Sequence, residues 1–266
     1  SWSSSDACWT MRIDRADADP PLTMRASFLV LCCGYYDYEA GHMPQIEGRE
    51  AYTGRVVHAQ QWDPQLDISG RRVVVIGSGA TAATLVPALA QRAAHVTMLQ
   101  RSPSYVLSRP AVDKLARALR RVLPERAVYA LSRWKNLTLA ALLYQLSRRR
   151  PAKMREFLLT QVRRALGPDQ VIDPHFTPRY DPWDQRLCLV PDGDLFRAIR
   201  RGTADIVTDT IERFTPTGID LTSGRHLDAD LVVSATGLTL QAGGGIAVEV
   251  DGQPVDLGRT YVYKGF

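Results

Sequence analysis

Residues 71–90 constrain the fold of this chain most, because they predict a strand, a tight turn and a helix in direct succession. Two arginines lead into the β-branched run at 73–76, which is typical of a buried parallel strand. The run ends in a Gly-x-Gly-x-x-Ala pattern, Gly77-Ser78-Gly79-Ala80-Thr81-Ala82, and residues 83–90 then place small and apolar side chains at helical spacing. In this context the glycine pattern predicts a turn that binds the pyrophosphate of a dinucleotide.

Each small residue of this turn has a separate physical role. Gly77 permits the sharp turn, Gly79 lets backbone N–H groups approach a phosphate without a Cβ in the way, and Ala82 lets the helix pack close to the strand. The helix N-terminus then offers free N–H donors to the phosphates. The alternative is an ordinary strand-to-helix turn that contains two glycines.

The end of the next predicted strand, residues 94–100, indicates which dinucleotide is bound. About 20 residues after the glycine turn, an NAD-binding protein carries Asp or Glu for the ribose hydroxyls. This chain has Gln100-Arg101-Ser102 there instead. A carboxylate would repel a 2′-phosphate, whereas Arg101 can pair with it through a forked, charge-assisted contact. We therefore predict NADP(H) over NAD(H), the alternative being that Arg101 is an ordinary solvated arginine.

Length and composition bound the remaining possibilities. The chain has 266 residues and a formal net charge of +5, which is enough for one large domain or two smaller ones. Its four cysteines show no metal-ligand spacing, so no metal site is predicted. No signal peptide opens the chain and no apolar run reaches the roughly 20 residues of a membrane span, so we expect a cytoplasmic protein with reduced thiols. The chain starts at Ser1, and we expect both ends to be cut from a longer protein.

The positive charge is concentrated in residues 111–166, a predicted helical insertion. This segment holds fourteen Lys and Arg against three acidic residues. Its apolar residues repeat at helical spacing over 112–123, 127–146 and 153–166. The favoured interpretation is a solvated, salt-bridged helical face, with weak peripheral contact with anionic lipid as the alternative. We expect no nucleic-acid partner.

The other elements are predicted from apolar runs and turn residues. Residues 27–34 indicate a buried strand that ends in Gly34 and can sit against a cofactor, and the last long strand ends in Ala235-Thr236-Gly237 in a similar way. An aromatic connector is expected at 35–64 and a loop at 167–190. Further predictions are strands at 8–14, 23–26, 205–208, 211–215, 218–221 and 226–227, a helix at 193–201 and a hairpin at 248–255.

The most specific motif lies in the predicted connector, with the spacing Tyr52-x-Gly54-x-x-x-His58-x-x-x-Trp62-Asp63. It matches the fingerprint of Baeyer–Villiger monooxygenases, with Tyr52 where that fingerprint has Phe. The chain therefore resembles the class B flavoprotein monooxygenases and is most similar to the Baeyer–Villiger type, in particular the ethionamide-activating type.

The resemblance implies an α/β fold in which a Rossmann-like NADP-binding domain is inserted into a truncated FAD-binding domain. Residues 1–64 would be the later part of the FAD-binding domain and the connector. Residues 65–237 would be the NADP-binding domain with its helical insertion at 111–166, and residues 238–266 would begin the return to the FAD-binding domain.

The activity that the resemblance implies depends on FAD and NADPH. NADPH would reduce the flavin, and a flavin C4a-peroxide formed with O2 would insert oxygen into a ketone or oxygenate sulfur. Arg186 matches the catalytic arginine of the family and would stabilise the peroxide. Arg101 and Ser102 match the 2′-phosphate contacts, and Gln185 stands where many relatives have lysine. Gly34, Thr236 and Gly237 would lie beside a cofactor.

The resemblance leaves two alternatives open. One is an N- or S-oxidising flavin monooxygenase of the N,N-dimethylaniline monooxygenase type. The other is an NADP-binding remnant without oxygenase chemistry. A Gly-x-Gly-x-x-Gly turn for FAD does not occur before the connector, so we expect the fragment to bind FAD poorly and to be inactive alone. The motif residues His58 and Trp62 would link the connector to the domains rather than take part in chemistry.

Overall fold

The computed structural model describes residues 1–15 and 18–260. The chain divides into two compact units. One unit is Met43–Gly237, and the other combines Ser1–His42 with Leu238–Phe266. Each unit is described by itself.

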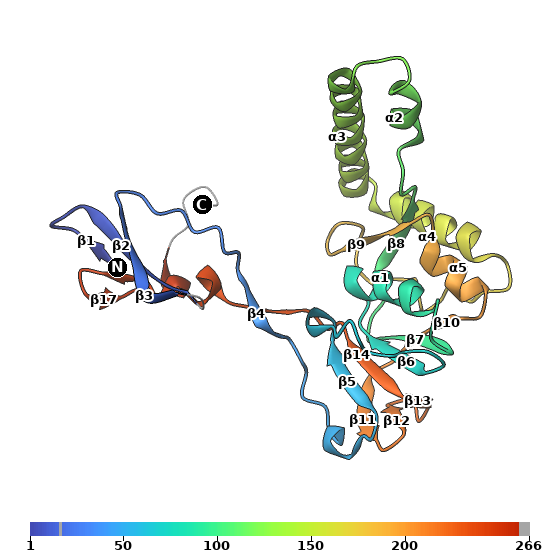
Figure 1. Ribbon diagram of the computed structural model, residues 1–266. Coiled ribbons are helices and arrows are strands. Elements are labelled where there is room, and N and C mark those ends of the chain that lie inside the picture. The colour runs from blue at the N-terminus through green and yellow to red at the C-terminus, as the bar shows by residue number, and fades with distance from the viewer. Residues whose placement is uncertain (16–17, 261–266) are drawn as a thin grey trace. The chain divides into compact units, whose positions relative to one another are not determined.

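The larger unit is built on a five-stranded parallel sheet with the strand order β10-β7-β6-β14-β5 (Figure 1). The strands are β5 (Arg55–His58), β6 (Arg72–Ile76), β7 (His95–Gln100), β10 (Ala204–Thr208) and β14 (Leu231–Ser234). β6 and β7 are hydrogen-bonded neighbours in parallel register, and α1 (Ala80–Leu89) connects them. The predicted strand, turn, helix and strand at 71–102 are thereby confirmed.

Alternation along β6 divides the core of this unit between the two faces of the sheet. Val73 and Val75 pack in one apolar cluster with α1 and α5 (Asp194–Arg200), whereas Val74 packs in a second cluster. Successive side chains of a strand point to opposite faces, so a run of β-branched residues fills both cores at once. The second cluster is closed by an antiparallel sheet of β11 (Ile211–Thr215), β12 (Gly218–Leu221) and β13 (His226–Asp228).

The basic segment forms the three predicted helices. They are α2 (Lys114–Leu119), α3 (Glu125–Arg149) and α4 (Pro151–Leu166). Asp113 caps α2 by accepting hydrogen bonds from the backbone N–H groups of Leu115 and Ala116, both at 3.1 Å. α4 starts at Pro151, because proline is tolerated at the first position of a helix but not inside one.

Two parts of this unit differ from the sequence prediction. Residues 55–58 of the predicted connector form the edge strand β5, which pairs with β14. The predicted loop at 167–190 ends in a strand, β9 (Leu187–Pro191), which pairs in parallel with β8 (Tyr105–Arg109). Both strands are four or five residues long, and a partner distant in sequence stabilises each, so local pattern was insufficient to predict them.

The smaller unit is mostly antiparallel. Its main sheet has the order β17-β16-β1-β2-β3 and a two-stranded sheet pairs β4 with β15. The strands are β1 (Trp2–Ser3), β2 (Cys8–Arg15), β3 (Ala18–Ala26), β4 (Tyr36–Gly41), β15 (Leu238–Leu240), β16 (Glu249–Val250) and β17 (Gln253–Pro254). The predicted hairpin at 248–255 is confirmed, because Asp251 and Gly252 both have positive φ, as its tight turn requires. Short 3₁₀ helices in the two units are η1 (Arg49–Ala51), η2 (Ala59–Gln61), η3 (Ala242–Gly245) and η4 (Leu257–Arg259).

The predicted buried strand at 27–34 is wrong. These residues form no strand, and the side chain of Phe28 is 80% exposed. A strand is stable only when a neighbouring strand accepts and donates its backbone hydrogen bonds. Among the described residues no strand pairs with this segment, so its apolar composition alone does not make it a strand. Gly34 accordingly lies in irregular chain with a φ of 72°.

The close packing at Gly77 predicts that a side chain at this position lowers the stability of the protein. Gly77 has a φ of 143°, and a Cβ there would lie 2.5 Å from the carbonyl oxygen of Ala235. We expect Gly77→Ala to lower the free energy of unfolding by about 2–4 kcal/mol, because strain and overlap add. The matched control is Gly202→Ala, which also has a positive φ but no atom within 4 Å of the added Cβ. It should cost only about 1 kcal/mol. Equal losses in urea unfolding would contradict the close approach at Gly77.

Candidate nucleotide-binding site

The glycine turn lies at the carboxyl edge of the parallel sheet. The backbone N–H of Gly77 donates to the carbonyl of Leu99 over 2.8 Å, which ties the turn to the neighbouring strand. Gly79 is the N-cap of α1 and makes no side-chain capping bond. The N–H groups of the first helical turn therefore have no intrahelical acceptor and point out of the helix end. A helix N-terminus with this geometry binds phosphate oxygens.

The end of β14 forms the other wall of the turn. Ala235 follows β14, and its N–H donates to the carbonyl of Ile76 over 2.8 Å. Thr236 shares a hydrogen bond of 2.7 Å with Ser234 through their hydroxyl groups. Gly237 comes next with a φ of 107°. The structure thus brings Thr236 and Gly237 to the sheet edge that holds the glycine turn, whereas Gly34 belongs to the other unit.

Arg186 lies directly over the glycine turn. A Cβ built on Gly79 would lie 2.9 Å from Nη1 of Arg186. The residue precedes β9 and is held through Tyr180, whose hydroxyl donates to the carbonyl of Arg186 over 3.1 Å. Tyr105 in β8 donates in turn to the carbonyl of Tyr180 over 2.9 Å, and the two rings meet edge to face. A loop residue is therefore positioned by two buried or half-buried tyrosines.

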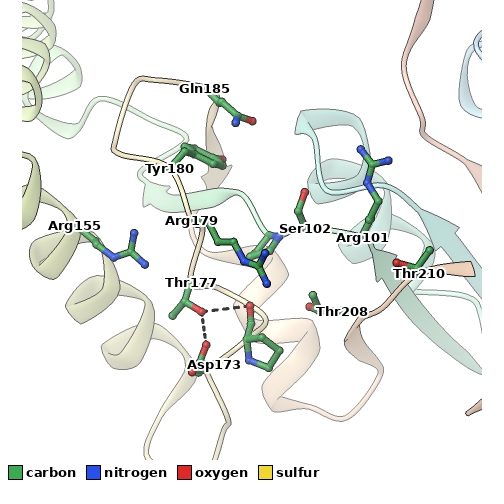
Figure 2. A pocket seen from close by; sticks show the side chains of 12 residues that line it. Arg101, Ser102, Arg155, Asp173, Thr177, Arg179, Tyr180, Gln185, Thr208 and Thr210 are labelled. Carbon is green, nitrogen blue, oxygen red and sulfur yellow. Dashed lines mark hydrogen bonds between the residues drawn. The ribbon is translucent and has the colours of Figure 1, made fainter. Parts of the chain in front are cut away.

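A cavity of about 1030 Å³ opens at the ends of β7 and β10. Arg101, Ser102 and Gln185 all line it, so the structure brings these three predicted residues together. Sequence analysis missed two more cationic lining residues, Arg155 and Arg179. Figure 2 shows that the three arginines come from three separate elements: the end of β7, α4 and the loop before β9. No motif links α4 or this loop to the glycine turn, and the one signal in the sequence was the abundance of arginine.

The positive charge in the cavity is not neutralised by neighbours. Within the described parts of the chain, none of Arg101, Arg155 and Arg179 forms an ion pair with an acidic side chain. Arg155 donates instead to the hydroxyl of Tyr105 over 3.1 Å. One carboxylate, that of Asp173, lines the cavity and accepts a hydrogen bond from Thr177. Free guanidinium groups in a forked geometry are suited to binding phosphate.

The loop that carries Arg179 is anchored by a buried glutamine. Gln100 at the end of β7 donates through Nε2 to the carbonyl of His175 over 2.7 Å and to the hydroxyl of Thr208 over 2.9 Å. The Thr208 hydroxyl also lies 2.9 Å from Nδ1 of His175. Burial lowers the pKa of His175, so the neutral imidazole is favoured. Neutral hydrogen bonds thus hold the loop to two strand ends.

The Tyr52–Asp63 motif is assembled around β5. Tyr52 donates its hydroxyl to the carbonyl of Ala229 over 2.9 Å, and a Cβ on Gly54 would lie 2.3 Å from that hydroxyl oxygen. Gly54 is therefore required for the ring to fold back over its own chain. Burial, with a smaller contribution from Asp230, raises the pKa of Tyr52 to about 12.

The second half of the motif connects β5 to the end of β14. Nδ1 of His58 accepts from the backbone N–H of Gln60 over 3.2 Å, so the proton resides on Nε2, which donates to the carbonyl of Gly237 over 3.0 Å. Trp62 packs against the main apolar cluster. Asp63 pairs with Arg55 at 3.3 Å. These contacts place the motif next to the chain that leaves the sheet edge at Gly237.

A sequence profile of the flavin-binding monooxygenase-like family matches residues 19–171, so the chain belongs to this family. Among its relatives, the FAD-containing monooxygenase EthA of Mycobacterium tuberculosis is 50% identical over 99% of this chain and 54% of its own length. The probable FAD-binding monooxygenase AlmA of Acinetobacter baylyi is 49% identical over 97% of this chain and 51% of its own length. The chain therefore spans about half the length of these curated relatives.

Solved structures show the same fold. A steroid monooxygenase bound to NADP superposes with a TM-score of 0.66 at 24% identity, over 89% of this chain and 51% of that protein.

No group of three or more His, Cys, Asp or Glu side chains in residues 1–15 and 18–260 is arranged to hold a metal ion. The helices in these same residues all lack the length or the apolar character needed to cross a bilayer.

The raised pKa of Tyr52 predicts a loss of stability at alkaline pH. Below pH 10 the phenol is protonated in both states, and between pH 10 and about 12 the unfolded chain loses this proton while the folded unit retains it. The free energy of unfolding then falls by up to about 1.4 kcal/mol for each pH unit. Tyr52→Phe should remove this part of the slope, although it loses the hydrogen bond to Ala229. Tyr129→Phe, at an exposed tyrosine, is the control, and identical slopes for both variants in urea unfolding would refute the prediction.

Proposed function

We propose that this chain provides the NADPH-binding half of an FAD-dependent monooxygenase that oxygenates small ketones in the Baeyer–Villiger manner, or oxygenates sulfur. The observation that carries the proposal is the meeting of three features at one sheet edge. These are the glycine turn at 77–82, the cavity lined by arginine at the ends of β7 and β10, and Arg186 over Gly79. Family membership and the relatives' names support the oxygenase part of the proposal.

The residues at the sheet edge fit NADPH. The lack of a Cβ at Gly79 lets the guanidinium of Arg186 lie close to the N-terminus of α1. A cation and free helix N–H groups at one place suit a phosphate. Arg101 and Ser102 follow β7, where the ribose of a dinucleotide lies in such folds. Arg155 and Arg179 add positive charge to the same cavity, so we assign the 2′-phosphate to this wall.

The names of the relatives, rather than a second nucleotide-binding turn of the described residues, support FAD as a cofactor. EthA and AlmA are named for FAD. Gly34, which was expected beside a cofactor, lies in irregular chain rather than at the end of a strand. We therefore propose that a protein of the relatives' full length holds FAD, and that the residues described here contribute little to its binding. When bound, NADPH supplies a hydride and FAD supplies the activation of O2.

Arg186 is the residue that we propose to act on the reacting atoms. A guanidinium keeps its charge when water is excluded, so it can hold negative charge that develops on oxygen during transfer. Its position over Gly79 puts that charge next to the phosphate end of the glycine turn. The hydrogen bond from Tyr180 fixes the backbone at Arg186 while leaving the guanidinium free.

Removing a cation from the cavity should weaken NADPH more than NADH. We expect Arg101→Ala and Arg179→Ala each to lower the affinity for NADPH by roughly 10- to 100-fold, because a charge-assisted hydrogen bond contributes about 1.5–3 kcal/mol. NADH lacks the 2′-phosphate and should be affected little. The control is Arg201→Ala, an exposed arginine outside the cavity. Calorimetric titration that finds equal losses for both nucleotides would rule out a 2′-phosphate contact.

Oxygen transfer should depend on the charge at position 186. In a protein of full length, we expect Arg186→Ala to keep FAD and NADPH binding but to lose about 100-fold or more in lactone formation from a cyclic ketone. NADPH oxidation should continue and release hydrogen peroxide. Arg186→Lys should retain part of the activity, since lysine keeps the positive charge but lacks the planar guanidinium that donates two parallel hydrogen bonds. Full oxygenation by the alanine variant would disprove the role, and a wild type that oxygenates only amines would favour the N-oxidising alternative.

A further inference from the structure

The α2–α3 hairpin, residues 114–149, exposes many large apolar side chains. α3 has 25 residues, of which Val128 and Ser147 are buried. Between them the helix leaves large side chains in solvent, and the loop between the two helices does the same. The most exposed are Val122, Tyr129, Leu131, Trp134, Leu137 and Leu142, with Val122 77% and Trp134 71% exposed. Figure 1 shows α2 and α3 side by side as an antiparallel pair.

The basic side chains of this region are mostly unpaired. The sequence favoured a solvated, salt-bridged face, and the structure shows such ion pairs for a minority of the cations. Of the fourteen Lys and Arg in residues 111–166, three form ion pairs with acidic side chains of the described chain. These pairs are Arg120–Glu125, Lys135–Asp113 and Arg148–Asp184. Two of the three acidic residues of the segment are used in them, so most of its cations have no acidic partner among the described residues.

The hairpin exposes apolar and cationic groups together, and a binding partner must make favourable contacts with both. A second copy would bring two strongly positive segments together, and their repulsion opposes association. A nucleic acid would neutralise the cations through its phosphates but leave the leucines and Trp134 without a favourable contact. An anionic bilayer surface satisfies both, because acyl chains accept the apolar groups and lipid phosphates accept the cations.

We propose that the α2–α3 hairpin docks this chain on an anionic lipid surface. Since none of the described helices is able to cross a bilayer, the hairpin lies at the interface. Trp134 and Tyr129 enter the headgroup region, where amphipathic rings are preferred. Arg121 and Arg126, close to the loop between the helices, contact lipid phosphates while their aliphatic stems cover apolar surface.

Cosedimentation with vesicles tests this docking and needs neither cofactor nor substrate. The chain should bind vesicles of equimolar phosphatidylcholine and phosphatidylglycerol, should bind phosphatidylcholine vesicles weakly, and should dissociate partly at high salt. Arg121→Gln/Arg126→Gln should lower the partition coefficient by about 25-fold, at roughly fivefold for each cation. Trp134→Ser/Leu137→Ser should lower it by about tenfold. All four side chains are exposed, so these variants should fold.

Matched variants in the same unit separate the hairpin from general effects of charge or apolarity. Arg200→Gln/Arg201→Gln removes two exposed cations outside the hairpin, and Val171→Ser/Leu189→Ser removes two exposed apolar side chains. Neither pair should change binding measurably. The proposal is overturned if the chain does not sediment with anionic vesicles or if hairpin and control variants lose binding equally. It is also overturned if sedimentation equilibrium without lipid shows a dimer that Trp134→Ser/Leu137→Ser dissociates, which would assign the face to a second copy.

Discussion

The close approach between the glycine turn and the end of β14 is the constraint on which the candidate site depends. Position 77 strongly favours a residue without a Cβ, since that atom would lie 2.5 Å from the carbonyl oxygen of Ala235. This approach lets α1 begin at the carboxyl edge of the sheet, where the N–H groups of its first turn lack intrahelical acceptors. The same edge receives Thr236 and Gly237, so two strand ends and one helix N-terminus share a single location.

Positive charge at this location is assembled without neutralising it. Arg101, Arg155 and Arg179 come from three separate elements, and Arg186 lies on the same loop as Arg179. Neutral groups hold most of this loop, and the Arg148–Asp184 ion pair adds one charged contact. Gln100 holds the loop before β9 through amide hydrogen bonds, and Tyr180 holds the backbone at Arg186. Carboxylates paired with these four arginines would compete with a phosphate for the guanidinium groups. Among the described residues no carboxylate forms such a pair, so the cations remain available to an anionic ligand.

Two exposed apolar regions of the chain differ in their surroundings. The segment at 27–34 is apolar and lacks a strand partner among the described residues. The α2–α3 hairpin adds a surplus of unpaired Lys and Arg to its apolar side chains. An apolar surface alone does not define a partner, whereas apolar groups interleaved with free cations match the chemistry of an anionic interface. The hairpin is thus the region whose composition specifies what covers it.

The sequence by itself determined the elements whose signals are local. The β-branched run at 73–76, the glycine turn and the helical spacing after it specified strand, turn and helix, because each depends on neighbouring residues only. The helices of the basic segment and the Asp251-Gly252 hairpin followed from the same kind of signal. The tertiary structure alone decided which distant segments meet. It placed Arg155 and Arg179 in the cavity of Arg101, turned residues 55–58 into an edge strand, and left 27–34 unpaired, because pairing and burial depend on partners that local sequence does not encode.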